Sequence, residues 1–220
     1  MIKTDRLLPA LLTCGLLSSL LYVGADIFAV LRYPGYDYRS QAISEMSAIG
    51  APTANLLAPL YTLYSALFAL FGAGVWLAAG GRRSLRASSI FLIAIAALGI
   101  GWAIFPMNAR GTERTLTDTM HLAMGGASSL FIISAIVCGA AAFGRIFRLY
   151  SAATVLVMLA FGYLMSIDVP RVATNLPTPY LGITERTMMA AWLLWMAVLS
   201  MTLLRGNRII PAVRLRLQGE

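Results

Sequence analysis

The only histidine of the chain, His121, follows an acidic residue, Asp118, by one helical turn at the start of an apolar segment. A carboxylate at this spacing can orient an imidazole and raise its basicity, which a general base needs near neutral pH. The same two residues also fit a purely structural hydrogen bond between neighbouring helices. The spacing therefore predicts either an acid/base pair or a structural contact.

Other acidic residues are expected at the same depth. Asp26 lies near the end of the first apolar segment, Asp168 ends the fifth, and Glu185 precedes the sixth. Ionisable groups at the edge of a hydrocarbon layer are costly unless they face a cavity or one another, so they indicate a candidate site. The alternative is that these three acids only mark helix ends in the headgroup region, where Thr184 would serve as an N-cap before Glu185.

Our hypothesis divides the candidate residues by role. The proposed acid/base group is His121, Asp118 and Glu45. The proposed substrate-binding group is Arg39, Ser44, Asp26, Glu185 and Arg186, in which an arginine would bind an anionic headgroup. We expect neither a metal ion nor a cofactor, because one histidine cannot build a three-histidine zinc site and no nucleotide-binding, zincin or nucleophilic-serine motif occurs.

Membrane-spanning helices must position these residues. Six apolar segments are predicted to span, approximately residues 7–30, 56–79, 88–105, 118–142, 150–167 and 187–204. At about 1.5 Å per residue, each is long enough to cross a hydrocarbon core of roughly 30 Å. The chain is 59% hydrophobic and only 12% charged, which leaves no water-soluble domain between the spans. We predict an all-α polytopic protein: a single integral membrane domain over residues 1–220 that forms a six-helix bundle.

Basic residues are divided unequally between the two ends of this predicted bundle. Eleven of the 17 Lys and Arg residues lie at the end that carries both termini, and six lie at the other. The positive-inside rule then places both termini in the cytoplasm and the acidic cluster outside. The same pattern explains the net charge of +8 without a nucleic-acid partner. The first segment exceeds the usual apolar region of a signal peptide, about 7–15 residues, so we expect it to remain as a span.

The first outer connection, residues 31–55, contains a short amphipathic segment over residues 40–49. Its apolar residues share one helical face: Ala42, Ile43, Met46 and Ile49. Gly50 and Pro52 end the segment, which is too short to span. We predict a short amphipathic helix at the outer interface, with Glu45 near the face that carries His121. It would serve either as a lid over a site or as an interfacial brace.

Three stretches of the sequence carry a family resemblance: RSQAISEMSAIGAPTANLLAPLYTLYSALF, then FPMN before the fourth span, then GITERTMMAAWLLW at the sixth. Together they resemble a family of bacterial and archaeal six-helix membrane proteins classed as domain of unknown function nine-nine-eight. The ISE-x-x-x-x-G-x-P element, residues 43–52, is more remotely similar to an outer-loop element of the eukaryotic damage-regulated autophagy modulator and GPI-remodelling family. The resemblance implies the topology and a prokaryotic cytoplasmic membrane, but no activity.

Three functions fit these observations. The favoured one is an outward-facing polar site that binds or modifies a lipid or another amphiphile from the outer leaflet. A small-solute transporter is an alternative, although no internal repeat joins the two halves of the chain. A non-catalytic membrane organiser is the third, with the basic tail at residues 205–216 on anionic lipids. Membrane lipids and an amphiphilic small molecule are the expected partners, while enzymatic activity and oligomeric state stay open.

Overall fold

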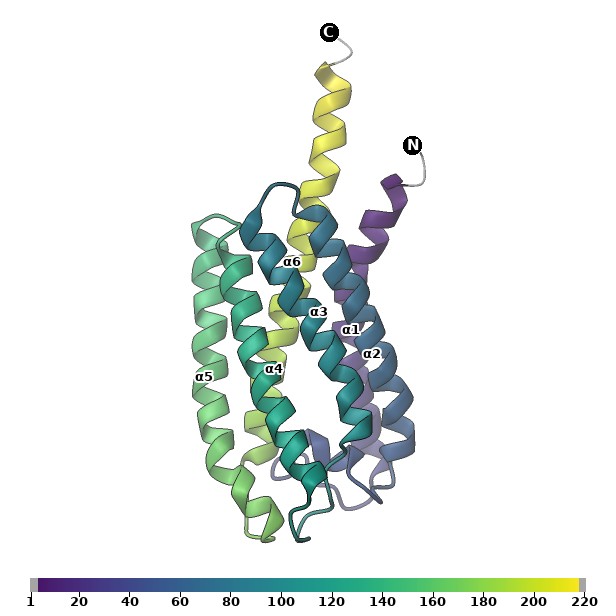
Figure 1. Ribbon diagram of the computed structural model, residues 1–220, viewed down its shortest axis with the longest axis vertical. Helices are drawn as coiled ribbons and strands as arrows, with labels where there is room; N and C mark the ends of the chain where they lie inside the picture. Colours follow the sequence, from purple (N-terminus) through teal and green to yellow (C-terminus); the bar gives the residue numbers. More distant parts are fainter. Residues whose placement is uncertain (1–3, 218–220) are drawn as a thin grey trace.

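Six long helices make up the computed structural model of the chain, which describes residues 4–217 and the side chains of residues 7–206 (Figure 1). They are α1 (Thr4–Arg32), α2 (Ala54–Ala78), α3 (Arg83–Ile104), α4 (Leu116–Ala140), α5 (Arg145–Ala173) and α6 (Leu181–Leu217). Each contains a stretch long and apolar enough to cross a membrane. No strand occurs among residues 4–217. The predicted all-α bundle of six transmembrane helices is confirmed.

Several helices continue beyond the predicted spans. The α5 helix passes residue 167 and runs through Pro170 to Ala173, so Asp168 lies inside it and does not end it. The α6 helix begins at Leu181, and Thr184 is therefore not its N-cap. The Thr184 hydroxyl instead donates to the Leu181 carbonyl at 2.9 Å. Apolar composition identifies only the hydrocarbon-crossing part of a helix, whereas the backbone hydrogen bonds carry the helix into the polar boundary.

Large aromatic side chains fill the middle of the bundle. Trp192 and Trp195 of α6 are stacked with ring centroids 5.7 Å apart, and Phe68 and Phe71 of α2 are fully buried beside them. The small residues of α1 allow close packing here: a Cβ atom on Gly15 would lie 2.7 Å from the Phe71 ring. Small residues on one helix thus accommodate rings from the next, as expected of helices that associate in lipid.

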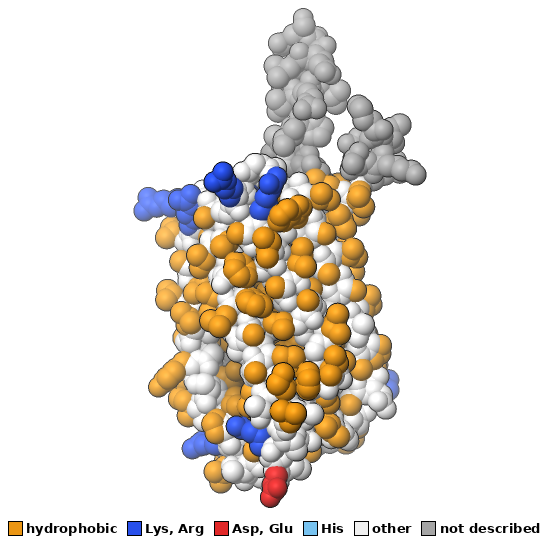
Figure 2. All heavy atoms as spheres, in the orientation of Figure 1, with side chains coloured by type: hydrophobic (Ala, Val, Ile, Leu, Met, Phe, Trp, Pro, Cys, Tyr) orange, Lys and Arg blue, Asp and Glu red, His pale blue; other side chains and the backbone are white. Residues whose placement is uncertain are grey.

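The helices form a ring in chain order, in which α6 closes against α1. The contact between α4 and α5 is the loosest of the neighbouring pairs in the ring. On the face drawn in Figure 2, apolar side chains cover the middle of the bundle and basic side chains lie toward its ends. This surface suits contact with lipid chains, and the α4–α5 seam is the least tightly packed part of the wall.

We call the end that holds the connections 33–53, 105–115 and 174–180 the distal end; α1 begins and α6 ends at the opposite end (Figure 1). The predicted short helix of the first connection is present as a 3-10 helix, η1 (Ile43–Ser47), which is shorter than the expected range of 40–49. Ile43 and Met46 are buried against Ala25 and Leu57 of α1 and α2. The connection therefore packs on the bundle and does not extend into solvent.

Side-chain hydrogen bonds hold the start of this short helix. The backbone N–H of Ala42 donates to Glu45 at 2.8 Å, and that of Ile43 donates to Glu185 at 2.7 Å. The Tyr36 hydroxyl donates to the carbonyl oxygens of Gln41 and Ala42 at 2.9 and 2.8 Å. The first N–H groups of a helix have no partner within it, so the Glu45 and Glu185 carboxylates cap η1 at its start.

Candidate functional site

The predicted site residues all lie at the distal end, where they fall into separate groups. Four belong to a network of ion pairs and backbone contacts: Asp26, Glu45, Glu185 and Arg186. Three line a cavity: Ser44, Asp118 and His121. Arg39 is exposed, and its guanidinium lies 4.7 Å from the centroid of the Tyr180 ring. The structure therefore brings these residues to one end of the bundle, but not into one site.

Arg186 of α6 forms a buried ion pair with Asp26 of α1. Its Nε and Nη2 atoms donate to the two carboxylate oxygens at 3.1 and 2.9 Å, and both residues are only 8% exposed. Nη2 also donates to the Tyr36 hydroxyl at 2.9 Å. Nη1 donates to three backbone carbonyls, those of Tyr38, Gln41 and Gly182. Each nitrogen of the guanidinium has a partner, so Arg186 has no free donor for a ligand.

Tyr36 supports the same network from the first connection. Burial raises the pKa of its phenol above the ordinary value, which keeps the hydroxyl protonated as a donor to the backbone. A guanidinium, a phenol and a carboxylate thus hold α1, α6 and the first connection together.

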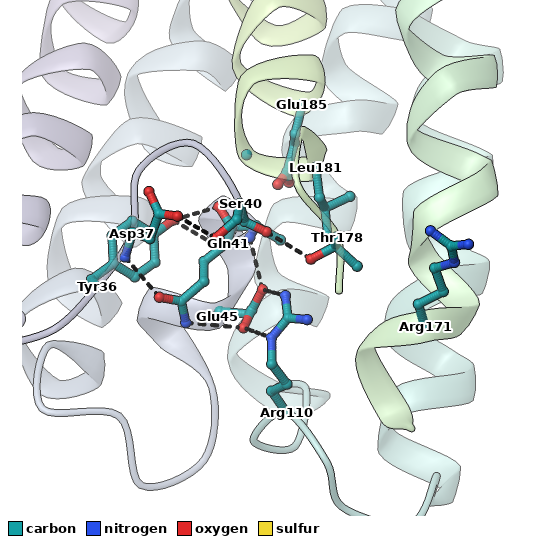
Figure 3. Close-up of polar contacts among 12 residues, drawn as sticks. Tyr36, Asp37, Ser40, Gln41, Glu45, Arg110, Arg171, Thr178, Leu181 and Glu185 are labelled. Carbon is teal, nitrogen blue, oxygen red and sulfur yellow. Dashed lines mark hydrogen bonds and ion pairs between the residues drawn. The ribbon is translucent and has the colours of Figure 1, made fainter. Parts of the chain in front are cut away.

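Glu45 forms a second, bidentate ion pair with Arg110 of the connection between α3 and α4 (Figure 3). The Arg110 Nε and Nη2 atoms lie 2.9 and 2.7 Å from the two carboxylate oxygens. Glu45 is 3% exposed and also accepts the Ala42 backbone N–H. No hydrogen bond among the described residues joins Glu45 to His121, so the carboxylate fastens two connections to each other.

Glu185 fastens the first connection from α6 through the Ile43 backbone. Thr178 adds a hydrogen bond from its hydroxyl to the Ser40 carbonyl at 2.8 Å. We call residues 36–49 except Ser44, together with Asp26, Arg110, Glu185 and Arg186, the polar cover. Its side chains connect parts of the chain that are distant in sequence, which is a structural role.

A cavity of about 80 Å³ lies beside the polar cover. We call it the distal cavity. Its polar lining comes from the first connection, the α3–α4 connection and α4: Ser44, Asn108, Thr112, Arg114, Asp118 and His121. Its apolar lining includes Leu122 of α4 and Val169 and Val172 of α5. The cavity therefore lies at the distal end of the α4–α5 seam.

Residues just before the start of α4 hold the Asp118 carboxylate. It accepts the Thr115 backbone N–H at 2.9 Å and, from Asn108, the backbone N–H at 2.8 Å and the side-chain amide at 2.6 Å. The Thr115 hydroxyl donates to it at 3.1 Å. These contacts resemble a capping box, in which an acid three residues after the N-cap binds back to the cap. Both oxygens are engaged, and neither bonds His121 among the described contacts.

His121 has a different partner. Its Nδ1 atom lies 3.0 Å from the Phe105 carbonyl oxygen, and its ring packs edge-to-face on Trp102 with centroids 4.5 Å apart. A carbonyl oxygen can only accept, so Nδ1 carries the proton of this hydrogen bond. In the neutral ring, Nε2 is then the atom with a free lone pair. The Phe105 carbonyl, and not Asp118, is the hydrogen-bond partner of the ring.

One comparison with known proteins gives a match. The family model described as protein of unknown function, DUF998, matches residues 16–202. The chain belongs to the DUF998 family. No curated protein and no solved structure matches it. The resemblance of the sequence to this family is confirmed, and the six apolar helices agree with a six-helix membrane family.

Two arginines of this DUF998 member were not among the predicted site residues. Arg110 neutralises Glu45, and Arg114 lines the distal cavity. The spacing of Thr115 and Asp118 resembles a capping box and could have indicated that Asp118 is used at a helix end. No comparable signal identifies Arg110, because its partner lies 65 positions away in the chain.

Proposed function

We propose that this membrane protein binds an amphiphile, with the polar head in the distal cavity and the apolar tail toward the lipid. The single observation that carries this proposal is the composition of the cavity lining. His121 and Ser44 face the same space as Leu122, Val169 and Val172. Sites for small molecules typically combine a mostly apolar lining with a few placed polar groups.

The position of the cavity on the α4–α5 seam gives it lateral access from the lipid, which favours an amphiphile over a small polar solute as the ligand. The cavity lies where α4 meets α5, and this pair of helices is the most loosely packed in the ring. The polar cover closes the adjoining surface through two ion pairs. A molecule that enters along the seam keeps its tail in the hydrocarbon region while its head reaches the polar groups.

His121 is the group we assign to the head of the ligand. Its Nε2 accepts a hydrogen bond from a hydroxyl or a bound water, since Nδ1 is engaged by Phe105. If the ligand is also modified, the same nitrogen is the proton acceptor, because a general base must lie within hydrogen-bond reach of the proton it removes. Binding and modification thus depend on one atom.

The distal end faces outward in this proposal. It carries only six of the 17 Lys and Arg residues: Arg32, Arg39, Arg110, Arg114, Arg171 and Arg186. The opposite end carries Arg82, Arg83, Arg86, Arg145, Arg148 and Arg205; the side chains of Lys3, Arg6, Arg208, Arg214 and Arg216 lie outside the described residues. By the positive-inside rule the termini are cytoplasmic, and the ligand comes from the outer leaflet. Reporter fusions after Arg83 and at the C-terminus are both expected to report cytoplasm; an external C-terminus would overturn this orientation.

The test of binding is lipid retention. The protein is purified from membranes in a mild detergent, and the lipids that remain bound are quantified by mass spectrometry for wild type, His121→Ala and the control Ser134→Ala. Ser134 lies on the same helix and donates only to its own backbone, at 2.8 Å to Leu130. A lipid class retained by wild type and S134A, and lost from H121A, is the expected result. Equal retention in all three would favour the organiser function instead.

A further inference from the structure

Arg114 differs from three other arginines of the distal end. Arg110, Arg171 and Arg186 each lie within 3.4 Å of a carboxylate oxygen. Arg114 lines the distal cavity, and among the described residues no hydrogen bond or ion pair involves its guanidinium. A guanidinium has five N–H donors in a fixed plane and is suited to phosphate and carboxylate groups. Arg114 is exposed to solvent, and it brings a positive charge and donors without a protein partner among the described residues to the cavity.

The acid of the cavity does not neutralise Arg114 through direct contact. Asp118 receives its hydrogen bonds from Asn108 and Thr115, and no ion pair joins it to Arg114 among the described residues. The Ser44 hydroxyl also makes no hydrogen bond in the part of the chain that the structure describes, although Ser44 lines the cavity. The cavity thus offers donors from Arg114 and Ser44, which an anion would satisfy.

The volume of the cavity restricts what enters it. A water molecule needs roughly 10–15 Å³ on the same measure, so about 80 Å³ accommodates only about five to eight atoms of that size. This is enough for a phosphate or a carboxylate, but not for an acyl chain. The apolar residues Leu122, Val169 and Val172 lie where the remainder of such a molecule would leave along the α4–α5 seam.

We infer that the ligand is an anionic amphiphile whose phosphate or carboxylate head binds Arg114 and Ser44, with His121 beside it and the tail in the α4–α5 seam. The inference rests on the proposed function and adds the charge of the head. It also moves the anion site away from Arg39 and Arg186, because Arg39 lies against Tyr180 and Arg186 is saturated by Asp26 and backbone carbonyls.

Three probes with one oleoyl chain test this inference: oleate, oleoyl lysophosphatidic acid and the uncharged monoolein. Their affinities are measured by native mass spectrometry of the full chain in detergent, for wild type, Arg114→Gln and the control Arg39→Gln. Arg39 is an exposed arginine of the same end. We expect wild type and R39Q to bind at least one anionic probe about tenfold more tightly than monoolein, a difference of about 1.4 kcal/mol. R114Q is expected to lose this preference and to keep the wild-type unfolding temperature.

Each outcome is informative. Preference for oleate identifies a carboxylate head, and preference for the lysophospholipid identifies a phosphate head. Equal binding of monoolein and both anions, with a loss in H121A, would overturn the anionic head and leave the proposed function intact. Absence of binding by all three probes would contradict the proposed function and this inference with it. An anion preference that survives in R114Q would also overturn the assignment.

Discussion

The polar cover and the distal cavity lie next to each other and draw on the same residue types, yet they differ in how completely their polar atoms are paired. In the cover, Arg186 uses all three of its nitrogens and Glu45 both of its oxygens. In the cavity, the Ser44 hydroxyl and the Arg114 guanidinium have no partner among the described residues. Arg114 is exposed and Ser44 is partly buried, so water can satisfy their donors in the free protein and a ligand can replace that water.

This comparison assigns the acidic residues a structural role in the cover. Asp26, Glu45 and Glu185 stand out in the sequence because charge near lipid is costly. In the structure, each of them holds a backbone segment or an arginine in place. Their accumulation at one end builds the cover, which contributes Ala42 to the wall of the cavity beside Ser44.

The largest effect is expected when the buried ion pair is broken. Arg186→Met leaves the Asp26 carboxylate buried without its partner, which costs about 3–5 kcal/mol. Thermal unfolding in detergent, followed by tryptophan fluorescence, is expected to shift strongly downward, with less protein in the membrane. The double variant Asp26→Leu/Arg186→Met removes both charges and is expected to recover part of the loss. A wild-type unfolding temperature for R186M would show that the pair is not what holds the cover.

A backbone clash is expected to have the next largest effect. A Cβ atom on Gly182 would meet the carbonyl oxygens of Tyr38 and Gln41, and backbone atoms cannot move aside as a flexible side chain does. Gly182→Ala is therefore expected to displace the first connection and to destabilise the protein by about 1–3 kcal/mol. Gly126→Ala is the control, because nothing lies within 4 Å of its Cβ position. Protease cleavage within residues 33–53 should rise in G182A alone.

The sequence predicts local features of this molecule, but it does not predict contacts between residues that are far apart in the chain. The spans follow from apolar composition, because each helix satisfies its own backbone in lipid. The partners Asp26 and Arg186 are 160 positions apart, and no spacing rule connects them. Asp118 and His121 are one turn apart, yet Asn108 and Thr115 supply closer donors to the carboxylate. Proximity on one helix permits a contact, and competing partners decide whether it forms.

Glu45→Gln gives a smaller loss of stability than Arg186→Met. The amide keeps the shape of the side chain but removes the charge that pairs with Arg110, whose side chain is 18% exposed. Water can compensate a partly exposed guanidinium, so we expect a loss of about 1–2 kcal/mol in the free energy of unfolding. Glu113→Gln on an exposed position of the α3–α4 connection is the control. Equal unfolding temperatures for both variants would mean that Glu45 does not fasten the cover.

The smallest stability effects separate the two regions most clearly, and two serines of the first connection allow a matched test. The Ser40 hydroxyl belongs to the cover: it donates to Asp37 at 2.5 Å and is the main reason that the pKa of this carboxyl lies below its usual value. The Ser44 hydroxyl faces the distal cavity. Ser40→Ala is expected to lower the free energy of unfolding by less than about 1 kcal/mol, because Asp37 is exposed to water.

Ser44→Ala is expected to leave the ligand-free stability unchanged within about 0.5 kcal/mol. A ligand that binds only the folded state raises stability in proportion to RT ln(1 + [L]/Kd), so a weaker site gives a smaller shift in unfolding temperature. Added oleate or oleoyl lysophosphatidic acid should therefore stabilise S40A as much as wild type, and S44A less. If the lipid-induced shift falls equally in both variants, unpaired polar atoms do not distinguish the cavity from its cover. If it falls only in S40A, the ligand binds the cover and the assignment of the two regions must be exchanged.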